Sequence, residues 1–430
     1  MTIETPQLSL RPRLSRMVGR DPAQRGRAAT PLELLFDLTF VVAFGVTADQ
    51  TAHVLAEGHL VPALLGFAFA MFCAVWAWVN FSWFSSAFDT DDWFYRLTTM
   101  VQMMGVIVLA LGIPVMFESL DHGTVFDNSI MVAGYVVMRV AMIAQWLRAA
   151  HQAPTYRKSA LVYATMVGAA QVGWVLIFLI REAPAPVVFS LGVLVFAADV
   201  LAPSIAERVH DGTPWHPHHI AERYSLLTII ALGEGVFGTV ASVSALVEHS
   251  SWTLEAVVLI FAGTGLTFAL WWIYFLVPVG TLLEVRRDRA SAWGYIHVFL
   301  FPAITGMGAG LHVAAYVIEG ETELSVTAAV ACVAVPVFFF LAIAYAMYAY
   351  LVHEINRADV GKLVPALVLL ILGVMLAALG APIGVCLLVL LSAPVVFIVY
   401  FALVGWRHEE DALRRVIEAG RAGHVTGSTD

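Results

Sequence analysis

Carboxylates lie inside two strongly apolar segments of this sequence. Glu33 and Asp37 fall near the start of one apolar run, and Glu222 opens a second run that ends in Glu234. A charged side chain at the centre of a bilayer costs between about 3 and 15 kcal/mol, so it persists only where it faces a helix-bundle interior, a partner or water. These residues therefore mark the segments in which we expect the working part of the protein.

Glu33 and Asp37 are four residues apart, which places both carboxylates on one face of a helix. Two such groups can bind a cation, or they can share a proton if their mutual repulsion favours the protonated form of one of them. Asp37 lies roughly 8 Å along the helix from Leu32 and is the deeper of the two. An alternative interpretation of Glu33 is that it favours the positive N-terminus of its helix.

Glu234 lies about 18 Å along the helix axis from Glu222, near the middle of a bilayer. Gly233 and Gly235 flank it, and they permit close backbone approach or local unwinding. An unpaired carboxylate at this depth is protonated or binds a cation. We therefore expect Glu234 to be a site for a proton or a substrate.

Other polar residues extend this candidate site. Asp49 lies toward the far end of the first apolar segment, where it faces the site or an outer vestibule. Glu222 and Arg223 begin the second carboxylate-bearing segment, so they either lie at the membrane interface or take part in the site. Arg223 is a candidate partner for Asp37. Arg96, one turn inside the third apolar segment, could neutralise Asp37 or an aspartate of the loop that precedes that segment.

An acidic loop precedes that third segment and holds Asp89, Asp91 and Asp92. Metal binding is possible there, but a helix N-cap explains Asp91 or Asp92 more simply. His297 lies near the start of a later apolar segment, as Arg96 does in the third. A single histidine inside the membrane is more often a hydrogen-bonded polar group than a ligand. With Tyr274 it also motivates an enzymatic alternative.

A histidine-rich loop joins the two carboxylate-bearing halves. It contains His210, Asp211, His216, His218 and His219. Such a cluster can bind a transition metal. Proline and glycine make the loop flexible and no cysteine is close, so the metal content of the protein stays open.

The composition requires helices that span a membrane. The chain has 430 residues, of which 60% are hydrophobic and 13% charged, and its mean hydropathy is +0.83. These values predict an all-α polytopic integral membrane protein. About twelve transmembrane helices are expected, at 32–56, 60–86, 93–117, 129–149, 159–181, 185–205, 223–246, 252–277, 294–316, 326–352, 361–379 and 382–406.

Charge placement predicts the orientation. If the N-terminus is cytoplasmic, most of the 23 basic residues fall in cytoplasmic segments, while acidic residues such as Asp121 and Glu319 fall in outer loops. Such an asymmetry is typical of the positive-inside rule. We therefore expect both termini to be cytoplasmic.

The two carboxylate-bearing runs resemble each other, which predicts two parallel six-helix repeats. Glu33 aligns with Glu222, and residues 38–40 then align with 227–229. The predicted parts are a cytoplasmic Arg-rich N-terminal segment (1–30), the first half (31–205), a cytoplasmic His-rich linker (206–222), the second half (223–406) and a cytoplasmic tail (407–430). The tail reads as an amphipathic helix at the inner surface.

Five stretches carry a family resemblance. They are PLELLFDLTFV at 31–41, FDTDDWFYR at 88–96, HIAERYSLLTIIALGE at 219–234, WWIYF at 271–275 and YIH at 295–297. Together they resemble the bacterial low-temperature-requirement A (LtrA) family, with Ser225 standing where a glycine is expected. The resemblance implies a multi-pass protein of the bacterial cytoplasmic membrane and important positions at these motifs. It implies no particular chemistry, because the activity of the family is undefined.

These observations favour a transporter or channel for a small solute or ion, with proton coupling through the intramembrane carboxylates. The alternatives are a membrane-embedded enzyme or accessory factor that acts on a lipid-like or quinone-like substrate, and a stress-response membrane protein that conducts nothing. An enzyme is the less favoured class because no hydrolase nucleophile or zinc-protease motif is evident. We expect no cofactor and no nucleic acid partner; the expected partners are membrane lipids and the solute or ion.

Overall fold

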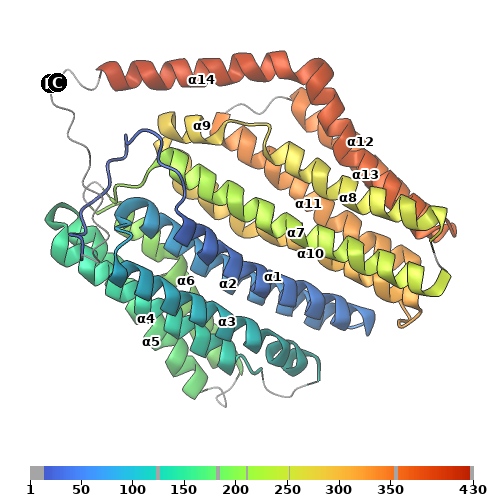
Figure 1. Ribbon diagram of the computed structural model, residues 1–430, viewed down its shortest axis with the longest axis horizontal. Helices are drawn as coiled ribbons and strands as arrows, with labels where there is room; N and C mark the ends of the chain where they lie inside the picture. The colour runs from blue at the N-terminus through green and yellow to red at the C-terminus, as the bar shows by residue number, and fades with distance from the viewer. Residues whose placement is uncertain are drawn as a thin grey trace. The chain divides into compact units, whose positions relative to one another are not determined.

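The protein is helical, and the computed structural model describes most of the chain (Figure 1). The described residues are 14–122, 126–180, 185–209, 212–250, 252–352 and 357–426. Their long apolar helices are α1 (Pro31–Ala56), α2 (Leu60–Phe88), α3 (Trp93–Asp121), α4 (Ser129–Gln152), α5 (Arg157–Leu179), α6 (Ala185–Glu207), α7 (Pro217–Ser250), α8 (Leu254–Tyr274), α10 (Ala290–Glu319), α11 (Val326–Val352), α12 (Arg357–Ala378) and α13 (Ile383–Tyr400). No strand occurs in these ranges.

The predicted all-α membrane fold is confirmed. Within the described residues, 11 helices are long and apolar enough to cross a bilayer. Among the described residues, the apolar part of α12, Leu363–Ala378, is shorter. Helix α7 begins at Pro217, before the predicted start at residue 223, and this earlier start brings His219 into the helix. The predicted boundary between the fifth and sixth spans, at 181–184, lies outside the described residues.

Shorter elements connect and follow these helices. They are η1 (Pro154–Tyr156), α9 (Val279–Val285), η2 (Arg287–Arg289), a π-helical turn η3 (Phe401–Gly405) and α14 (Trp406–Thr426). Helix α14 confirms that the tail is helical. The prediction that it lies on the membrane surface stays a prediction, as do the six-helix repeats.

The chain forms two compact units, and each is described by itself. Unit 1 comprises Met1–Gln24, Trp83–Gly105 and Val136–Trp215, and unit 2 comprises Arg25–Ser82, Val106–Tyr135 and His216–Asp430. In unit 1, α5 packs against α6, and Trp146 of α4 stacks on Tyr163 of α5 with ring centroids 4.1 Å apart. This aromatic pair fixes the spacing of the two helices.

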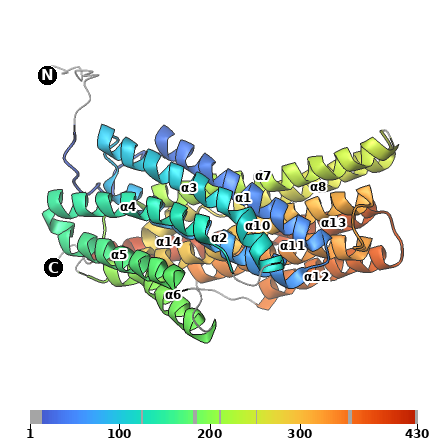
Figure 2. The same cartoon turned by 90° about the horizontal axis from the view of Figure 1, so that it is seen from below.

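Helix α10 is the centre of unit 2, where it packs against α1, α7 and α11 (Figures 1 and 2). Two close approaches hold it to α7: a Cβ added at Gly308 would lie 2.7 Å from the backbone carbonyl carbon of Glu234, and one added at Gly235 would lie 2.6 Å from Met307. Gly235 thus makes room for neighbouring side chains, and the close approach to a backbone is made at Gly308. Nothing lies within 4 Å of a Cβ at Gly233, and α7 continues unbroken, so the predicted local unwinding is absent here.

Candidate functional site

Helix α1 begins with a capping box formed by Thr30 and Glu33. The Glu33 carboxylate accepts hydrogen bonds from the Thr30 backbone N–H at 2.8 Å and from the Thr30 hydroxyl at 3.1 Å. The backbone N–H of Glu33 donates in return to Thr30 Oγ1 at 3.3 Å. These bonds satisfy donors that the first turn of a helix leaves unpaired, and they place the carboxylate at the positive end of α1. The interpretation of Glu33 as a helix-start residue is confirmed.

Arg223 of α7 binds both acidic residues of α1. Its Nη1 donates to Glu33 Oε1 at 2.9 Å, and its Nη2 donates to Asp37 Oδ1 at 2.5 Å. The side chains of all three residues are fully buried. Charge-assisted bonds of this kind are roughly twice as strong as neutral ones. The predicted contact between Arg223 and Asp37 is confirmed.

Two ring side chains complete this arrangement. His219, one turn before Arg223, places Nε2 3.2 Å from Glu33 Oε2, and Trp78 of α2 donates from Nε1 to Asp37 Oδ1 at 2.7 Å. We call Glu33, Asp37, Trp78, His219 and Arg223 the inner network, because it lies at the end of unit 2 that is predicted to face the cytoplasm. Within the described part of the chain, Asp37 Oδ2 and His219 Nδ1 have no hydrogen-bond partner.

The charges of the inner network balance. Glu33 and Asp37 supply two negative charges and Arg223 one positive charge. The buried Arg27 lies close enough for its charge to act on the ring of His219, and it supplies the second positive charge. Removing either cation would leave an uncompensated charge in the interior. The inner network therefore acts as a structural tie between α1 and α7.

Aromatic rings surround the inner network. The ring of Tyr224 meets Trp78 and Trp293 at 4.8 Å and His297 at 4.6 Å between centroids. His297 Nδ1 lies 2.9 Å from the Trp293 carbonyl oxygen, which requires a proton on Nδ1. The unprotonated Nε2 then accepts a hydrogen bond from the Tyr274 hydroxyl at 3.0 Å. His297 is thus a satisfied polar group, as the sequence favoured.

Glu234 has the opposite environment. The residue is 3% exposed, and its carboxylate makes no hydrogen bond or ion pair with any described residue. It lies beside Gly45 of α1, where an added Cβ would be 3.3 Å from Oε1. The closest charge that acts on it belongs to Asp49, which is also acidic. A carboxylate that is buried without a partner requires a proton or a cation.

A line of polar residues leads from Glu234 to the end of α1. Asp49 and His53 follow Gly45 at intervals of four on α1, and both are exposed. His312 and Tyr316 lie one turn apart on α10, half-buried, and the rings of His53 and Tyr316 are 6.3 Å apart. We call Glu234, Asp49, His53, His312 and Tyr316 the Glu234 seam. It is open to solvent or a bound solute at Asp49 and His53.

An apolar layer separates the Glu234 seam from the inner network. Arg223 and Glu234 are about 16 Å apart along α7. Apolar residues of α1, α7 and α10 in this interval are fully buried: Phe40, Phe44, Leu227, Ala231, Phe301 and Ile304. Close-packed side chains of this kind exclude water from the space that they fill between the two sites.

The acidic loop residues have other roles, within unit 1. Asp92 caps α3: its Oδ1 accepts a hydrogen bond from the backbone N–H of Tyr95 at 2.9 Å, and its carboxylate also pairs with Arg148. The N-cap prediction is therefore confirmed for Asp92. Arg96 was expected to face the interior and to neutralise either Asp37 or an aspartate of the acidic loop. The pairing with the loop is confirmed, and the interior position was wrong for Arg96. Its side chain is 61% exposed and pairs with Asp91 at 2.8 Å, because a long cation one turn from a helix start reaches the acidic loop more easily than the core.

Glu222 and the described linker histidines bind separate partners. Glu222 Oε2 accepts the backbone N–H of Ala29 at 3.1 Å. The backbone N–H of His219 donates to His216 Nδ1 at 3.2 Å, while His218 Nε2 lies 3.4 Å from Glu284. His210 lies outside the described residues. The linker histidines that are described therefore do not converge on one point.

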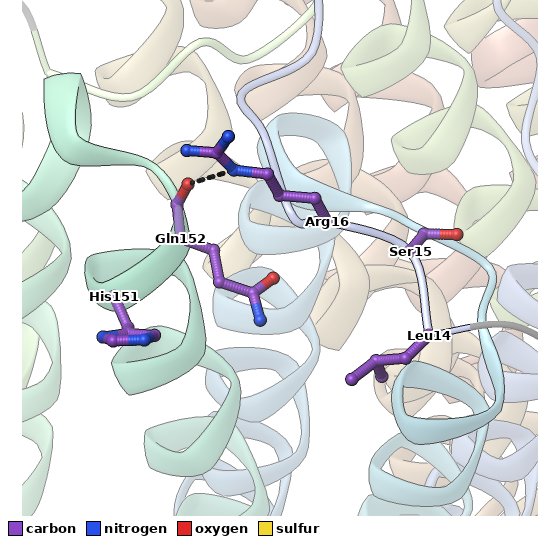
Figure 3. Close-up of a pocket in the computed structure, with 5 residues that line it drawn as sticks. All are labelled: Leu14, Ser15, Arg16, His151 and Gln152. Atoms are coloured by element: carbon purple, nitrogen blue, oxygen red, sulfur yellow. Dashed lines mark hydrogen bonds between the residues drawn. The ribbon is translucent and has the colours of Figure 1, made fainter.

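A shallow pocket of unit 1 lies where the N-terminal segment meets the end of α4 (Figure 3). Arg16 Nε donates to the Gln152 carbonyl oxygen at 3.3 Å, and the backbone N–H of Met17 donates to Gln152 Oε1 at 2.7 Å. Leu14, Ser15 and His151 complete the lining. These contacts fasten the segment to α4.

Sequence reasoning missed two members of the inner network, Trp78 and His219. His219 precedes Arg223 by four residues, the same spacing as Glu33 and Asp37. Each pair therefore lies on one face of its helix, and this matching spacing could have predicted that the two pairs contact each other. Trp78 is one of several tryptophans in α2, and nothing local distinguishes it from the others.

The comparisons with known proteins agree with the motifs. The family described as bacterial low temperature requirement A protein (LtrA) matches residues 28–394. This range contains the inner network and the Glu234 seam, and it continues past residue 300, where the quoted motifs end. No curated protein and no solved structure matches the chain. The chain belongs to the LtrA family of bacterial membrane proteins.

Proposed function

We propose that this protein is a carrier that moves a small solute or ion across the membrane and couples that movement to a proton bound at Glu234. The observation that carries the proposal is the environment of Glu234, a buried carboxylate with no hydrogen bond or ion pair to a described residue. A side chain that only stabilises the fold gains nothing from such a position. A side chain that binds and releases a proton or cation requires it.

The Glu234 seam supports access from one side. Asp49 and His53 are exposed at the far end of α1, and Asp49 is the charged group that acts on Glu234. A proton or cation that enters beside Asp49 reaches Glu234 without crossing the apolar layer. In this conformation the route ends there.

The inner network supports a gate on the other side. A path from Glu234 to the inner end must open the apolar layer and displace α1 relative to α7. That displacement stretches the bonds from Arg223 to Glu33 and Asp37. Protonation of Glu234 removes a buried charge and so changes the relative free energies of the two conformations.

The Tyr274–His297 pair gives less support to an enzyme. Both ring nitrogens of His297 already have partners, and the residue is fully buried. A general base needs a free nitrogen within reach of its substrate.

The test is a flux screen of solutes and ions with purified protein in liposomes, with and without a proton gradient. For a solute that the wild type moves, Glu234→Gln should abolish gradient-driven flux because Gln mimics the protonated side chain. Glu248→Gln, an exposed glutamate on the same helix, is the matched control and should keep normal flux. Normal proton-driven flux in Glu234→Gln would rule out the mechanism.

A further inference from the structure

A group of metal-ligating side chains lies at the other end of unit 2, beside the outer end of the Glu234 seam, where His53 Nε2 is 3.7 Å from Glu57 Oε1. Glu57 follows the last residue of α1, His59 lies in the turn to α2, Asp121 ends α3 and His122 follows it. We call these four residues the outer cluster. They come from two segments more than sixty residues apart in sequence, which the fold brings together.

The ligand atoms of the outer cluster converge. One atom each from Glu57, Asp121 and His122 lies within 4.8 Å of the other two. His59 Nδ1 lies 2.6 Å from Asp121 Oδ1 and 3.9 Å from Glu57 Oε2. His122 Nε2 lies 3.5 Å from Asp121 Oδ2. Ligands around a four-coordinate metal ion at about 2.1 Å stand roughly 3.4 Å apart, so small side-chain rotations close this set.

Asp121 is the fixed member of the outer cluster. Its side chain is 4% exposed, while those of His59, His122 and Glu57 are 45%, 63% and 39% exposed. A buried anchor with three mobile outer ligands can take up an ion from solvent and close around it.

We propose that the outer cluster binds one divalent transition-metal ion, with Zn²⁺ as the best match. Two imidazoles and two carboxylates are ligands that Zn²⁺ accepts in tetrahedral geometry, whereas Mg²⁺ and Ca²⁺ prefer all-oxygen sites. The bound ion clamps the α1–α2 turn to the end of α3. This inference is independent of the proposed transport function, since it concerns binding and stability.

The test uses the full chain in detergent micelles, purified with a histidine-free affinity tag and stripped with EDTA. Titration with Zn²⁺ should show one site, and Zn²⁺ should raise the temperature of unfolding in a concentration-dependent way. The X-ray absorption edge spectrum of the loaded protein should report nitrogen and oxygen ligands and no sulfur. A protein that binds no Zn²⁺, or a sulfur-containing ligand set, would overturn the proposal.

Variants locate the site. His122→Gln removes an exposed ligand, so the substitution should leave the fold intact. It should lower the Zn²⁺ affinity at least tenfold and abolish the rise in unfolding temperature that Zn²⁺ causes. His59→Gln should do the same. A His216→Gln/His218→Gln variant in the linker is the matched control and should bind Zn²⁺ like the wild type. Loss of the site in the linker variant, with normal binding in His122→Gln, would overturn the proposal and assign the metal to the linker.

Discussion

The two sites of unit 2 bury carboxylates on the same helices in opposite ways. In the inner network, Glu33 and Asp37 bind the Arg223 guanidinium. Trp78 donates to the same Asp37 oxygen as Arg223, and His219 lies beside the second oxygen of Glu33. In the Glu234 seam, one carboxylate is almost as deeply buried and has no hydrogen bond or ion pair to a described residue. Burial alone therefore does not distinguish a structural carboxylate from a functional one in this protein, whereas pairing does.

This contrast separates what each site contributes. Paired charges tie α1 to α7, and their loss should be seen first in stability. An unpaired carboxylate destabilises the fold as long as it is charged, so its loss should be seen in function.

The largest effect is expected for Arg223→Met. The change leaves Glu33 and Asp37 buried without their shared cation, so the free energy of unfolding should fall by about 3–5 kcal/mol. Unfolding by SDS in mixed micelles measures it. Adding Asp37→Asn to Arg223→Met leaves Glu33 balanced by Arg27 and should restore much of the loss. If this double variant is less stable than Arg223→Met alone, the inner network is not a charge-balanced tie.

A matched pair of substitutions compares the two sites directly. Glu33→Gln removes charge-assisted bonds to Arg223 and His219, so it should lower the free energy of unfolding by about 1.5–3 kcal/mol. Glu234→Gln makes the same chemical change where no bond is lost, and it should leave stability equal or higher. The same SDS unfolding experiment measures both. Equal destabilisation by the two substitutions would contradict the distinction between paired and unpaired carboxylates.

The close contact of α7 and α10 should be the next most sensitive feature. Gly308→Ala inserts a methyl group against the backbone of Glu234 and should lower the free energy of unfolding by about 1–3 kcal/mol. Gly233→Ala, one residue before Glu234, meets nothing within 4 Å and should raise stability by up to about 1 kcal/mol. If both substitutions act alike, α10 does not position Glu234 by close approach.

The sequence was sufficient for the helical fold because each span is a continuous apolar run, which a bilayer requires. It also predicted the Asp37–Arg223 contact, since two opposite charges in lipid must meet. For Arg96 it predicted a partner in the acidic loop correctly but failed for the interior position, since the side chain is exposed and pairs with Asp91. The expectation rested on position along the helix, and the face of the helix was unknown.

Other features depend on which helices become neighbours. The outer cluster joins the α1–α2 turn to the end of α3, and the Glu234 seam joins α1 to α10. His59, His122 and His312 carry no local signal, because a single histidine at a helix end or face is common. The exposure of Asp49 and His53 at one end of the seam also depends on how the helices pack. The spacing of residues within one helix does not predict that packing.

The smallest effect concerns a paired carboxylate of unit 1 that lies outside the membrane-spanning helices. Burial raises the pKa of Asp92, but the hydrogen bonds from Arg148 and from the backbone N–H groups of Tyr95 and Ser15 outweigh it, so the pKa lies below its ordinary value of 3.8. A carboxyl whose pKa is lowered by folding contributes stability that is present above the unfolded-state pKa and is lost as the pH falls through the folded-state pKa.

The advantage of the wild type over Asp92→Asn in unfolding temperature should therefore be constant from pH 7 to pH 5 and shrink below about pH 4. Asparagine still caps a helix, so the comparison isolates the charge. An advantage that persists unchanged to pH 3 would show that the Asp92–Arg148 pair adds nothing, and that in unit 1 the hydrogen bonds of the cap suffice.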